Sequence, residues 1–589
     1  MKRNSYVSFG AQGSSRPEVS PFVSYAYANE KLRFDAYVRY SNNVWKGKSR
    51  GEGLMYAEDS SQVRQYNSNW NSESRDNDVS VDFSLGYDFD SMNTLSAYVS
   101  LSPSWGNRFS DGRYEQTQLI ASAFEDYSYS SHGDSRSGYF WSYGSAEFEH
   151  KFNNEGHQIS FGVSGYGGGT LGSNVGTSWE HYDHQTHMNY DARTLGSENY
   201  HNVDFVVDYS YPYSDKGELN AGISVTLDGN SDYSRRDTLA TDNLYHCDVL
   251  RSDTSQSPSV GSRIYLSWRR KFGDFTLRVG GNLKNDYSAS RHLGLPQYDT
   301  AVNYWSVGPS LTLLYNTETM HSFSLNYSMY TSMPSASQMS RYVSYGTDNC
   351  STGNSQLEPS YTHDFGLGYD KYFEQGHSIG VSASYEMQFN QVDYISMPTY
   401  SDFFGRYVLF SKPFNTGNSR TGNIYVYARW RPTAVFNLTF SISAKDSWYR
   451  VMLHPGEWME DEMAGWNTRL YARAKLFNLV WVSVSGYYRS RSHGWSVLEI
   501  EEPGYGMDLG ASADLFDRML SFYINVNDVF NTANWNSTSI NPYAPSTSNY
   551  TYNSQYITFG VTLRFGKMEL SNSGREGIQE SKGEGKGGK

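Results

Sequence analysis

Cysteine and long apolar runs are both scarce in this sequence. The 589 residues include two cysteines, Cys247 and Cys350, which are too few for a disulfide framework and lack the spacing of a metal finger. No continuous apolar stretch reaches about 18 residues, and the mean hydropathy is -0.65, so a membrane-spanning helix is excluded. A membrane β-barrel is not excluded, because lipid-facing and lumen-facing residues alternate along its strands and average to middling hydropathy.

Positive charge is scarce as well. The chain has 62 acidic and 48 basic side chains, a net charge of -14, and no basic stripe that would neutralise phosphates, so we expect no nucleic-acid partner. His181, His184 and His187 carry metal-ligating side chains, but their spacing aligns them only on a helix. Their segment has the composition of a loop, where solvated histidines are the simpler interpretation. No nucleophile pairs with a base in a recognisable pattern, and we expect no enzyme, metal site or cofactor.

Proline is the third scarce residue, and aromatic residues are abundant. The chain has 16 Pro against 53 Gly, 51 Tyr, 30 Phe and 14 Trp, a mixture that favours strands and tight turns and predicts an all-β fold. Composition shifts only near the end, so we expect one domain over residues 1–565. Residues 566–589 are rich in Gly, Ser, Lys and Glu, which cannot bury a core, and we expect a disordered periplasmic tail there.

Strands with one apolar face recur along the chain. Between residues 79 and 90, Val, Phe, Leu and Tyr alternate with Ser, Gly and Asp, and similar stripes occupy residues 203–211, 219–227 and 436–444. Several run for about ten residues, the length that a tilted strand needs to cross a bilayer. We expect Phe205, Val207, Ile223 and Val225 to face lipid. The alternate positions then send acidic side chains of early strands and basic side chains of later strands into the lumen: Asp82, Asp88, Asp204, Asp208, Arg263, Arg269, Arg278, Arg429, Arg469 and Arg473.

Short and long connections take turns between these strands. Ten short links predict hairpins at residues 28–30, 90–92, 153–156, 214–216, 273–274, 316–318, 374–376, 431–434, 476–478 and 516–518. Longer polar segments lie between them, including residues 42–77, 104–137, 168–199, 229–258, 334–359 and 527–555. Ten hairpins supply twenty strands, and terminal strands at residues 6–12 and 556–565 raise the count to about 22. Short periplasmic turns opposite long extracellular loops are typical of an outer-membrane barrel, and a lumen of this size needs a plug. A soluble propeller or an adhesin of several sandwiches also has many strands, but no repeat period supports it.

Three stretches carry a resemblance to a known family. The first runs from Ser332 through Pro334 and continues as Gly353, Asn354, Leu357 and Pro359 before the strand at residues 362–369. The second is residues 520–531, with Asn527 and Phe530, and the third is the closing strand that ends on Phe565. Together they resemble the barrel of TonB-dependent receptors, in the outer-membrane β-barrel branch. Two positions depart from the usual motif, because Ser332 stands in place of Arg and Ser355 in place of Pro.

The resemblance implies a receptor that takes up a ligand across the outer membrane of a Gram-negative bacterium. Its implied partners are outer-membrane lipid, the barrel-assembly machinery that reads the terminal aromatic residue, the TonB system acting through a plug, and in some members a surface lipoprotein. No plug or signal peptide precedes Tyr6, so we expect that the natural chain extends upstream or that this is a truncated copy. A non-transporting barrel, either a surface adhesin or a relic, is the alternative.

Aromatic residues of the long polar segments are the candidate ligand contacts. They could stack on a sugar or an aromatic siderophore: Trp105, Tyr127, Trp179, Tyr182, Trp495 and Tyr543. Each could instead belong to the aromatic girdle at a membrane interface. Cys247 and Cys350 both fall in the long segments, where they either form one disulfide between loops or stay as two free thiols.

Overall fold

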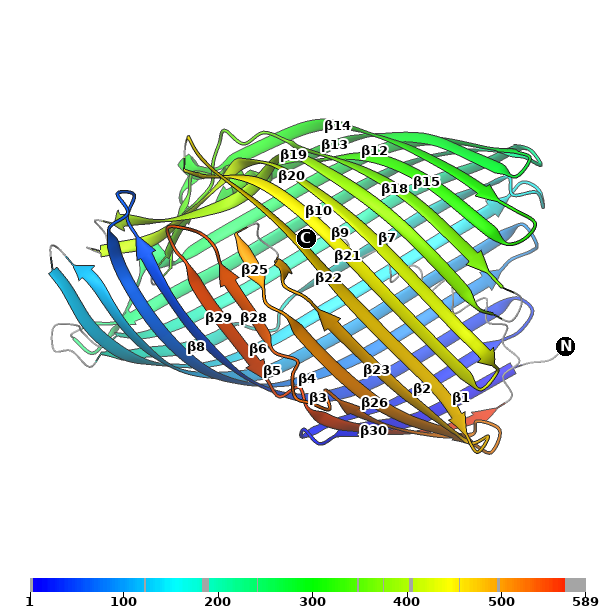
Figure 1. Ribbon diagram of the computed structural model, residues 1–589, viewed down its shortest axis with the longest axis horizontal. Helices are drawn as coiled ribbons and strands as arrows, with labels where there is room; N and C mark the ends of the chain where they lie inside the picture. Colours follow the sequence, from blue (N-terminus) through cyan, green and yellow to red (C-terminus); the bar gives the residue numbers. More distant parts are fainter. Residues whose placement is uncertain are drawn as a thin grey trace.

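The chain forms a closed β-barrel. The structure is a computed structural model that describes residues 4–120, 123–182, 190–240, 242–346, 349–373, 376–401, 406–454, 456–494 and 498–566. In these ranges thirty strands belong to one continuous sheet, which closes where β1 (Asn4–Ser14) pairs with β30 (Tyr556–Gly566). Figure 1 shows the tilted strands winding around a common axis, as closure of a sheet requires. No helix in the described ranges is long and apolar enough to cross a membrane.

Twenty-two antiparallel strands make the barrel, which confirms the count expected from the turns. Between β1 and β30 they are, in order around the barrel: β2 (Glu18–Ala28), β3 (Leu32–Tyr56), β4 (Gln62–Asp88), β5 (Asn93–Ile120), β6 (Ala123–Lys151), β7 (Gln158–Thr170), β9 (Tyr190–Ser214), β10 (Gly217–Leu239), β12 (Asp253–Phe272), β13 (Phe275–His292), β14 (Thr300–Asn316), β15 (His321–Ser332), β18 (Ser360–Tyr372), β19 (Ser378–Ser401), β20 (Arg406–Thr433), β21 (Phe436–His454), β22 (Glu457–Leu476), β23 (Val480–Arg489), β26 (Gly504–Leu515) and β27 (Leu520–Asn527).

The other elements lie in the extracellular connections. They are β8 (Asn174–Tyr182), β11 (Tyr245–Cys247), β16 (Val343–Tyr345), β17 (Asn349–Thr352), β24 (Ser492–His493), β25 (Glu499–Glu501), β28 (Trp535–Ser539), β29 (Ser546–Tyr552) and the short helices η1 (Val249–Arg251), η2 (Pro296–Tyr298) and α1 (Ala336–Met339). All ten predicted hairpins fall between strands that pair with each other, at the end of the barrel where both described termini lie.

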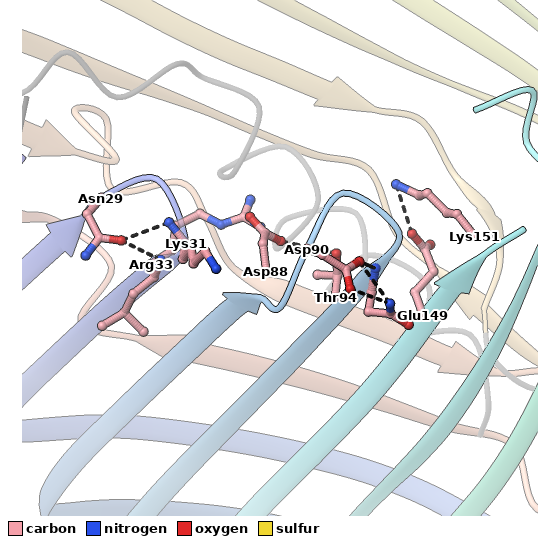
Figure 2. Close-up of polar contacts among 10 residues, drawn as sticks. Asn29, Lys31, Arg33, Asp88, Asp90, Thr94, Glu149 and Lys151 are labelled. Carbon is pink, nitrogen blue, oxygen red and sulfur yellow. Dashed lines mark hydrogen bonds and ion pairs between the residues drawn. The ribbon is translucent and has the colours of Figure 1, made fainter. Parts of the chain in front are cut away.

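Side chains of Asn and Asp build the short turns. Figure 2 shows two of them, where Asn29 accepts a hydrogen bond from the backbone N–H of Lys31 at 2.9 Å. In the next turn, Asp90 accepts a hydrogen bond from the backbone N–H of Met92 at 2.8 Å. Because such bonds replace backbone partners locally, these residues fix a tight turn whatever the rest of the fold does.

Paired charges line the lumen just above these turns. Arg33 and Asp88 form an ion pair at 3.1 Å between β3 and β4, and Thr94 donates its hydroxyl to the same carboxylate at 3.1 Å (Figure 2). Lys151 and Glu149 pair at 3.1 Å on β6. Polar contacts within and between neighbouring strands therefore stabilise the periplasmic rim.

The segments expected as long loops are mostly strand. β3 and β4 stay in one register from Leu32 opposite Tyr87 to Met55 opposite Arg64, so most of residues 42–77 continues the ladder. The same holds for most of residues 104–137 on β5 and β6, and of residues 229–258 on β10 and β12. These long extracellular segments are therefore mostly extended hairpins. Above the membrane no lipid demands an apolar face, so the period-two signal disappears while the hydrogen-bonded ladder continues.

The predicted lipid-facing residues lie on the outer surface. Phe205, Val207 and Ile223 are 49%, 37% and 51% exposed, and the register sets Val207 opposite Ile223 and Phe205 opposite Val225. The alternate residues of the same strands therefore face the lumen. The apolar surface of this protein is on its outside, as a barrel in lipid requires.

Candidate functional site

The lumen wall is polar and carries charges of both signs. The predicted inward residues lie opposite the exposed apolar face, and several have local partners: Tyr98 donates to Asp82 at 2.6 Å, and Arg269 pairs with Glu218. The expected separation into an acidic and a basic half is wrong, because Arg33 lies among the early strands and Asp364 among the later ones. Neighbour-by-neighbour pairing explains the mixture, since charges facing a shared lumen are stabilised by partners on adjacent strands.

One hollow of the lumen wall stands out by its composition. A pocket of about 390 Å³ lies toward the extracellular ends of β18 to β21 and beside the loop after β24. It is lined by carboxylate, ammonium, amide, hydroxyl and phenol groups: Asp364, Ser384, Glu386, Gln388, Gln391, Ser419, Thr421, Lys445, Tyr449 and Gly494. Its strands expose Phe365 and Tyr385 to lipid, by 41% and 42%, so Asp364 and Glu386 face inward. We call this hollow the lumen pocket.

The charges of the lumen pocket have no ion-pair partner among the described residues. Within the described part of the chain, no ion pair of 4 Å or less joins Lys445 to Asp364, to Glu386 or to any other carboxylate. Tyr449 is held in place, because its ring lies 4.7 Å from that of His493, whose Nε2 lies 2.8 Å from a carboxylate oxygen of Asp461. The pocket thus offers two carboxylates and one ammonium to a ligand or to another protein segment in the lumen.

Hairpin ends from opposite sides of the barrel meet above this pocket. β5 is the fifth strand of the 22 and β20 is the sixteenth, so they lie on opposite walls. Nevertheless the end of β5 pairs with the start of β20, and buried Gln118 donates to the backbone oxygen of Tyr407 at 3.1 Å. Val63, fully buried, packs in a cluster that includes Leu409. The hairpin ends must therefore arch across the mouth, and we call residues 54–65, 116–120 and 406–411 the extracellular lid.

The loop before β29 joins the lid. Tyr543 donates its hydroxyl to Glu457 at the tip of the β21–β22 hairpin, and this bond raises the pKa of Tyr543 to about 12. Its backbone oxygen accepts from the N–H of Tyr56 at 2.9 Å, and Asn541 donates to the backbone oxygen of Ser396 at 3.1 Å. Tyr543 thus lies where three hairpin ends and this loop converge.

The other candidate aromatic residues are dispersed. Trp105 is 47% exposed on the outward face of β5, opposite Asn77, which is a position of the membrane-interface girdle. Tyr127 is on β6, and Trp179 and Tyr182 are on β8, whose backbone pairs with β6. The side chains of these three residues and the whole of Trp495 lie outside the described residues.

The lumen pocket was not predicted, because Asp, Glu and Lys recur on so many lumen-facing positions that their sequence pattern does not single it out.

The two cysteines are free thiols. Cys247 is exposed at the end of β11, and Cys350 is buried on β17, where burial raises the pKa of its thiol. The alternative of a disulfide between loops is therefore wrong in this structure.

The first family motif holds one extracellular loop against the wall. Pro334 leads into α1, and Gly353 lies so close to it that an added Cβ would be 2.3 Å from the backbone oxygen of Ser340. Asn354 donates to the backbone oxygen of Pro413 at 3.0 Å, and Leu357 is buried. The backbone oxygen of Pro359 accepts from Asn390 at 3.0 Å. These residue types are needed to seat the β15–β18 connection on β19 and β20.

The second motif surrounds a carboxylate that anchors the last extracellular loop. Asn527 donates to Thr558 at 3.0 Å, whereas Phe530 and Phe565 are exposed. Asp528 is buried and accepts hydrogen bonds from the hydroxyl of Ser554 and from the backbone N–H groups of Thr532 and Ala533, the latter two at 2.9 Å. Burial alone would raise the pKa of Asp528, but these bonds outweigh it and hold the pKa below its usual value.

Replacing this carboxylate should release the loop. We expect Asp528→Asn to cost about 2 kcal/mol locally, because buried donors lose a charged acceptor. Proteolysis of residues 528–554 in the folded barrel should accelerate accordingly. Because the pKa of Asp528 is lower in the folded loop than in the unfolded chain, its charge stabilises the loop above the unfolded value near 4, and this stabilisation is lost as the pH falls below that value. Acidification should therefore accelerate proteolysis of the native protein, as the substitution does. It should have little further effect on the variant. Asp514→Asn, at the periplasmic end, is the control, and equal proteolysis of both variants would contradict the assignment.

A family profile and several solved structures are similar to this chain. The profile of the outer membrane protein beta-barrel family matches residues 150–565. The siderophore receptor PiuA from Acinetobacter baumannii has a TM-score of 0.63 at 10% identity, over 96% of this chain and 82% of that receptor. The ferric-catecholate import receptor Fiu from K12 E. coli has a TM-score of 0.63 at 11% identity, over 95% and 82%. The copper transporter OprC has a TM-score of 0.60 at 9% identity, over 96% and 81%. No curated protein sequence matches the chain.

At such low identity the structural neighbours establish the fold alone. Those named above are transport receptors and not enzymes, in agreement with the expectation from the sequence. The family profile covers more than half of the chain, including all three resembling stretches. The protein therefore lies in the outer membrane of a Gram-negative bacterium and belongs to the outer membrane protein β-barrel family, with the fold of TonB-dependent receptors.

Proposed function

We propose that this barrel is the translocation pathway of a TonB-dependent uptake receptor. The observation that carries the proposal is the lumen pocket, where Asp364, Glu386 and Lys445, which have no ion-pair partner in the described part of the chain, face the interior beneath the extracellular lid. A plug domain in the lumen would link the site to the TonB system. The barrel-assembly machinery and a surface lipoprotein are the other proposed partners.

The lumen pocket favours a polar ligand with a cationic or hydroxyl-rich part. Two carboxylates against one ammonium leave the wall with a net negative charge, and carboxylates accept strong hydrogen bonds from ammonium and hydroxyl groups. The amides of Gln388 and Gln391 add donors and acceptors that fix orientation. Candidate cargo includes ferric siderophores, cobalamin-like molecules, oligosaccharides and peptides. Of the aromatic residues predicted from the sequence, Trp105 faces lipid, and Tyr543 beside the lid, with Tyr127, Trp179, Tyr182 and Trp495, is proposed to make the first contacts.

Uptake assays test this function. Cells that express the natural gene are offered labelled ferric citrate, a ferric catecholate, cobalamin, maltohexaose or a cationic tripeptide. Accumulation of one probe should vanish when TonB is deleted. Asp364→Asn, Glu386→Gln and Lys445→Gln together should reduce it about tenfold or more, because charge-assisted hydrogen bonds contribute about 1.5–3 kcal/mol each.

The matched control changes the same number of charges elsewhere on the lumen wall. Asp204→Asn, Asp208→Asn and Arg263→Gln should leave uptake within about twofold, since they lie outside the lumen pocket. Uptake that persists without TonB would contradict energised transport. Surface expression with no accumulation of any probe would favour the adhesin-like alternative.

A further inference from the structure

A second pocket lies on the outside of the barrel wall, away from the lumen. It encloses about 690 Å³ above the β1–β2 hairpin. Its lining comes from β3, β4, β5, β29 and the loop after β27: Lys46, Gly47, Lys48, Asn71, Ser72, Glu73, Arg75, Phe109, Asp111, Asn531, Asn534, Thr551, Tyr552 and Asn553. We call it the outer-rim pocket.

The register shows that its charged residues face away from the barrel. β3 and β4 pair without a shift from Leu32 to Met55, so Lys46 and Lys48 share the face of lipid-exposed Val38. Glu73 and Arg75 on β4 likewise share the face of Phe83, which is 41% exposed. The outer-rim pocket is therefore continuous with the lipid-facing surface.

Its height matches the headgroup layer of the outer leaflet. The lipid-facing band ends at an aromatic girdle formed by Tyr40 and Trp105, which are 36% and 47% exposed. Arg75 is two residues beyond Asn77, whose amide oxygen accepts the Tyr40 hydroxyl at 2.7 Å. With a strand rise of about 3.3 Å and a tilt of about 40°, Arg75 lies roughly 5–10 Å above the girdle, Lys46 roughly 10–15 Å and Lys48 roughly 15–20 Å above it.

Three cations and two carboxylates line the outer-rim pocket. Glu73 pairs with Lys46 at 3.0 Å and with Arg75 at 2.8 Å, which holds both cations at the pocket. The Nδ1 atom of His132 lies 2.6 Å from a carboxylate oxygen of Asp111. Among the described residues, Lys48 has no ion-pair partner, so its ammonium is available to an incoming anion.

The remaining lining suits a sugar. Amides of Asn71, Asn531, Asn534 and Asn553 and the hydroxyl of Thr551 are donors and acceptors for hydroxyl groups, and Phe109 supplies an apolar ring. Basic side chains beside a membrane surface attract phosphate-bearing headgroups. Non-specific attraction between basic side chains and anionic headgroups would not by itself require this set of amides.

We propose that the outer-rim pocket binds the phosphorylated sugar headgroup of an outer-leaflet glycolipid, with Lys46, Lys48 and Arg75 holding phosphate and the asparagines holding the sugar. The bound lipid would continue downward along the apolar face, where Val38 and Val23 are exposed. Such a lipid would stabilise the β3–β4 extension against the membrane surface, independently of any transported ligand.

A thermal-stability experiment tests the proposal. The purified barrel in detergent is titrated with bisphosphorylated lipid A, with dephosphorylated lipid A, or with inorganic phosphate. We expect only the bisphosphorylated lipid to raise the midpoint temperature of unfolding. Lys46→Gln, Lys48→Gln and Arg75→Gln together should weaken its apparent affinity about tenfold or more.

The control variant removes three cations at the periplasmic end, with Lys31→Gln, Arg270→Gln and Lys271→Gln, and should keep the full shift. An equal shift with dephosphorylated lipid A would overturn phosphate recognition. The same shift with inorganic phosphate would overturn the lipid assignment in favour of a free anion. Retention of the shift in the triple variant of the outer-rim pocket would place lipid binding elsewhere.

Discussion

Val207→Arg and Ile223→Arg are each expected to lower the free energy of unfolding by about 2–4 kcal/mol in lipid vesicles. Both side chains lie on the lipid-facing surface, directly opposite each other on β9 and β10, with 37% and 51% exposure. A guanidinium there must leave water for hydrocarbon, which costs most near the middle of the bilayer. The variants should show less of the heat-resistant, fast-migrating folded form in electrophoresis and unfold at lower urea concentration.

The neighbouring Val206 provides a matched control. It is the one valine of this stretch that points into the lumen, between inward Asp204 and Asp208. Val206→Arg should therefore shift stability by less than about 1 kcal/mol, since water and two carboxylates receive the charge. If Val206→Arg abolished folding while Val207→Arg did not, the two faces of β9 would be inverted.

Turns and lipid-facing strands were predictable because their causes are local. Asn29 and Asp90 satisfy backbone donors within two residues, so the sequence alone marks the turn. The bilayer imposes a period of two on every crossing strand, and Phe205 and Ile223 reveal it without reference to their neighbours. These two signals give the strand count and the inside–outside assignment.

The extracellular half was not predictable in the same way. Above the membrane both faces of β3 and β4 meet water or protein, so hydropathy no longer distinguishes a strand from a loop. The contact of Gln118 with Tyr407 joins hairpins that are distant in sequence and opposite in the barrel, and no local pattern encodes it. The lumen pocket could not be predicted for a related reason. What distinguishes it is which charged side chains lack an ion-pair partner, and this depends on the three-dimensional structure.

The extracellular lid leads to the prediction with the largest functional effect. Contacts across the mouth should restrict ion flow even when no plug is in the lumen, because the buried cluster around Val63 and Leu409 closes hairpin ends from opposite walls over it. Val63→Asp places a carboxylate at a position with 0% exposure, and the cost of burying it should separate the hairpin ends. In planar bilayers we expect the native barrel to conduct weakly and the variant to show a several-fold larger, persistently open conductance.

The control is Val249→Asp, which introduces the same carboxylate on another extracellular hairpin. Val249 is 76% exposed in η1, so its replacement should leave conductance unchanged. A plug domain supplied to the Val63→Asp barrel should lower its conductance again, since a barrel of this diameter encloses an aqueous lumen unless something fills it. If the native barrel already conducted as strongly as Val63→Asp, the lid would not seal the mouth, and closure would depend on a plug alone. These conductance measurements distinguish two barriers that the ligand must pass. One is made by hairpin ends of this chain, and the other by a domain in its lumen.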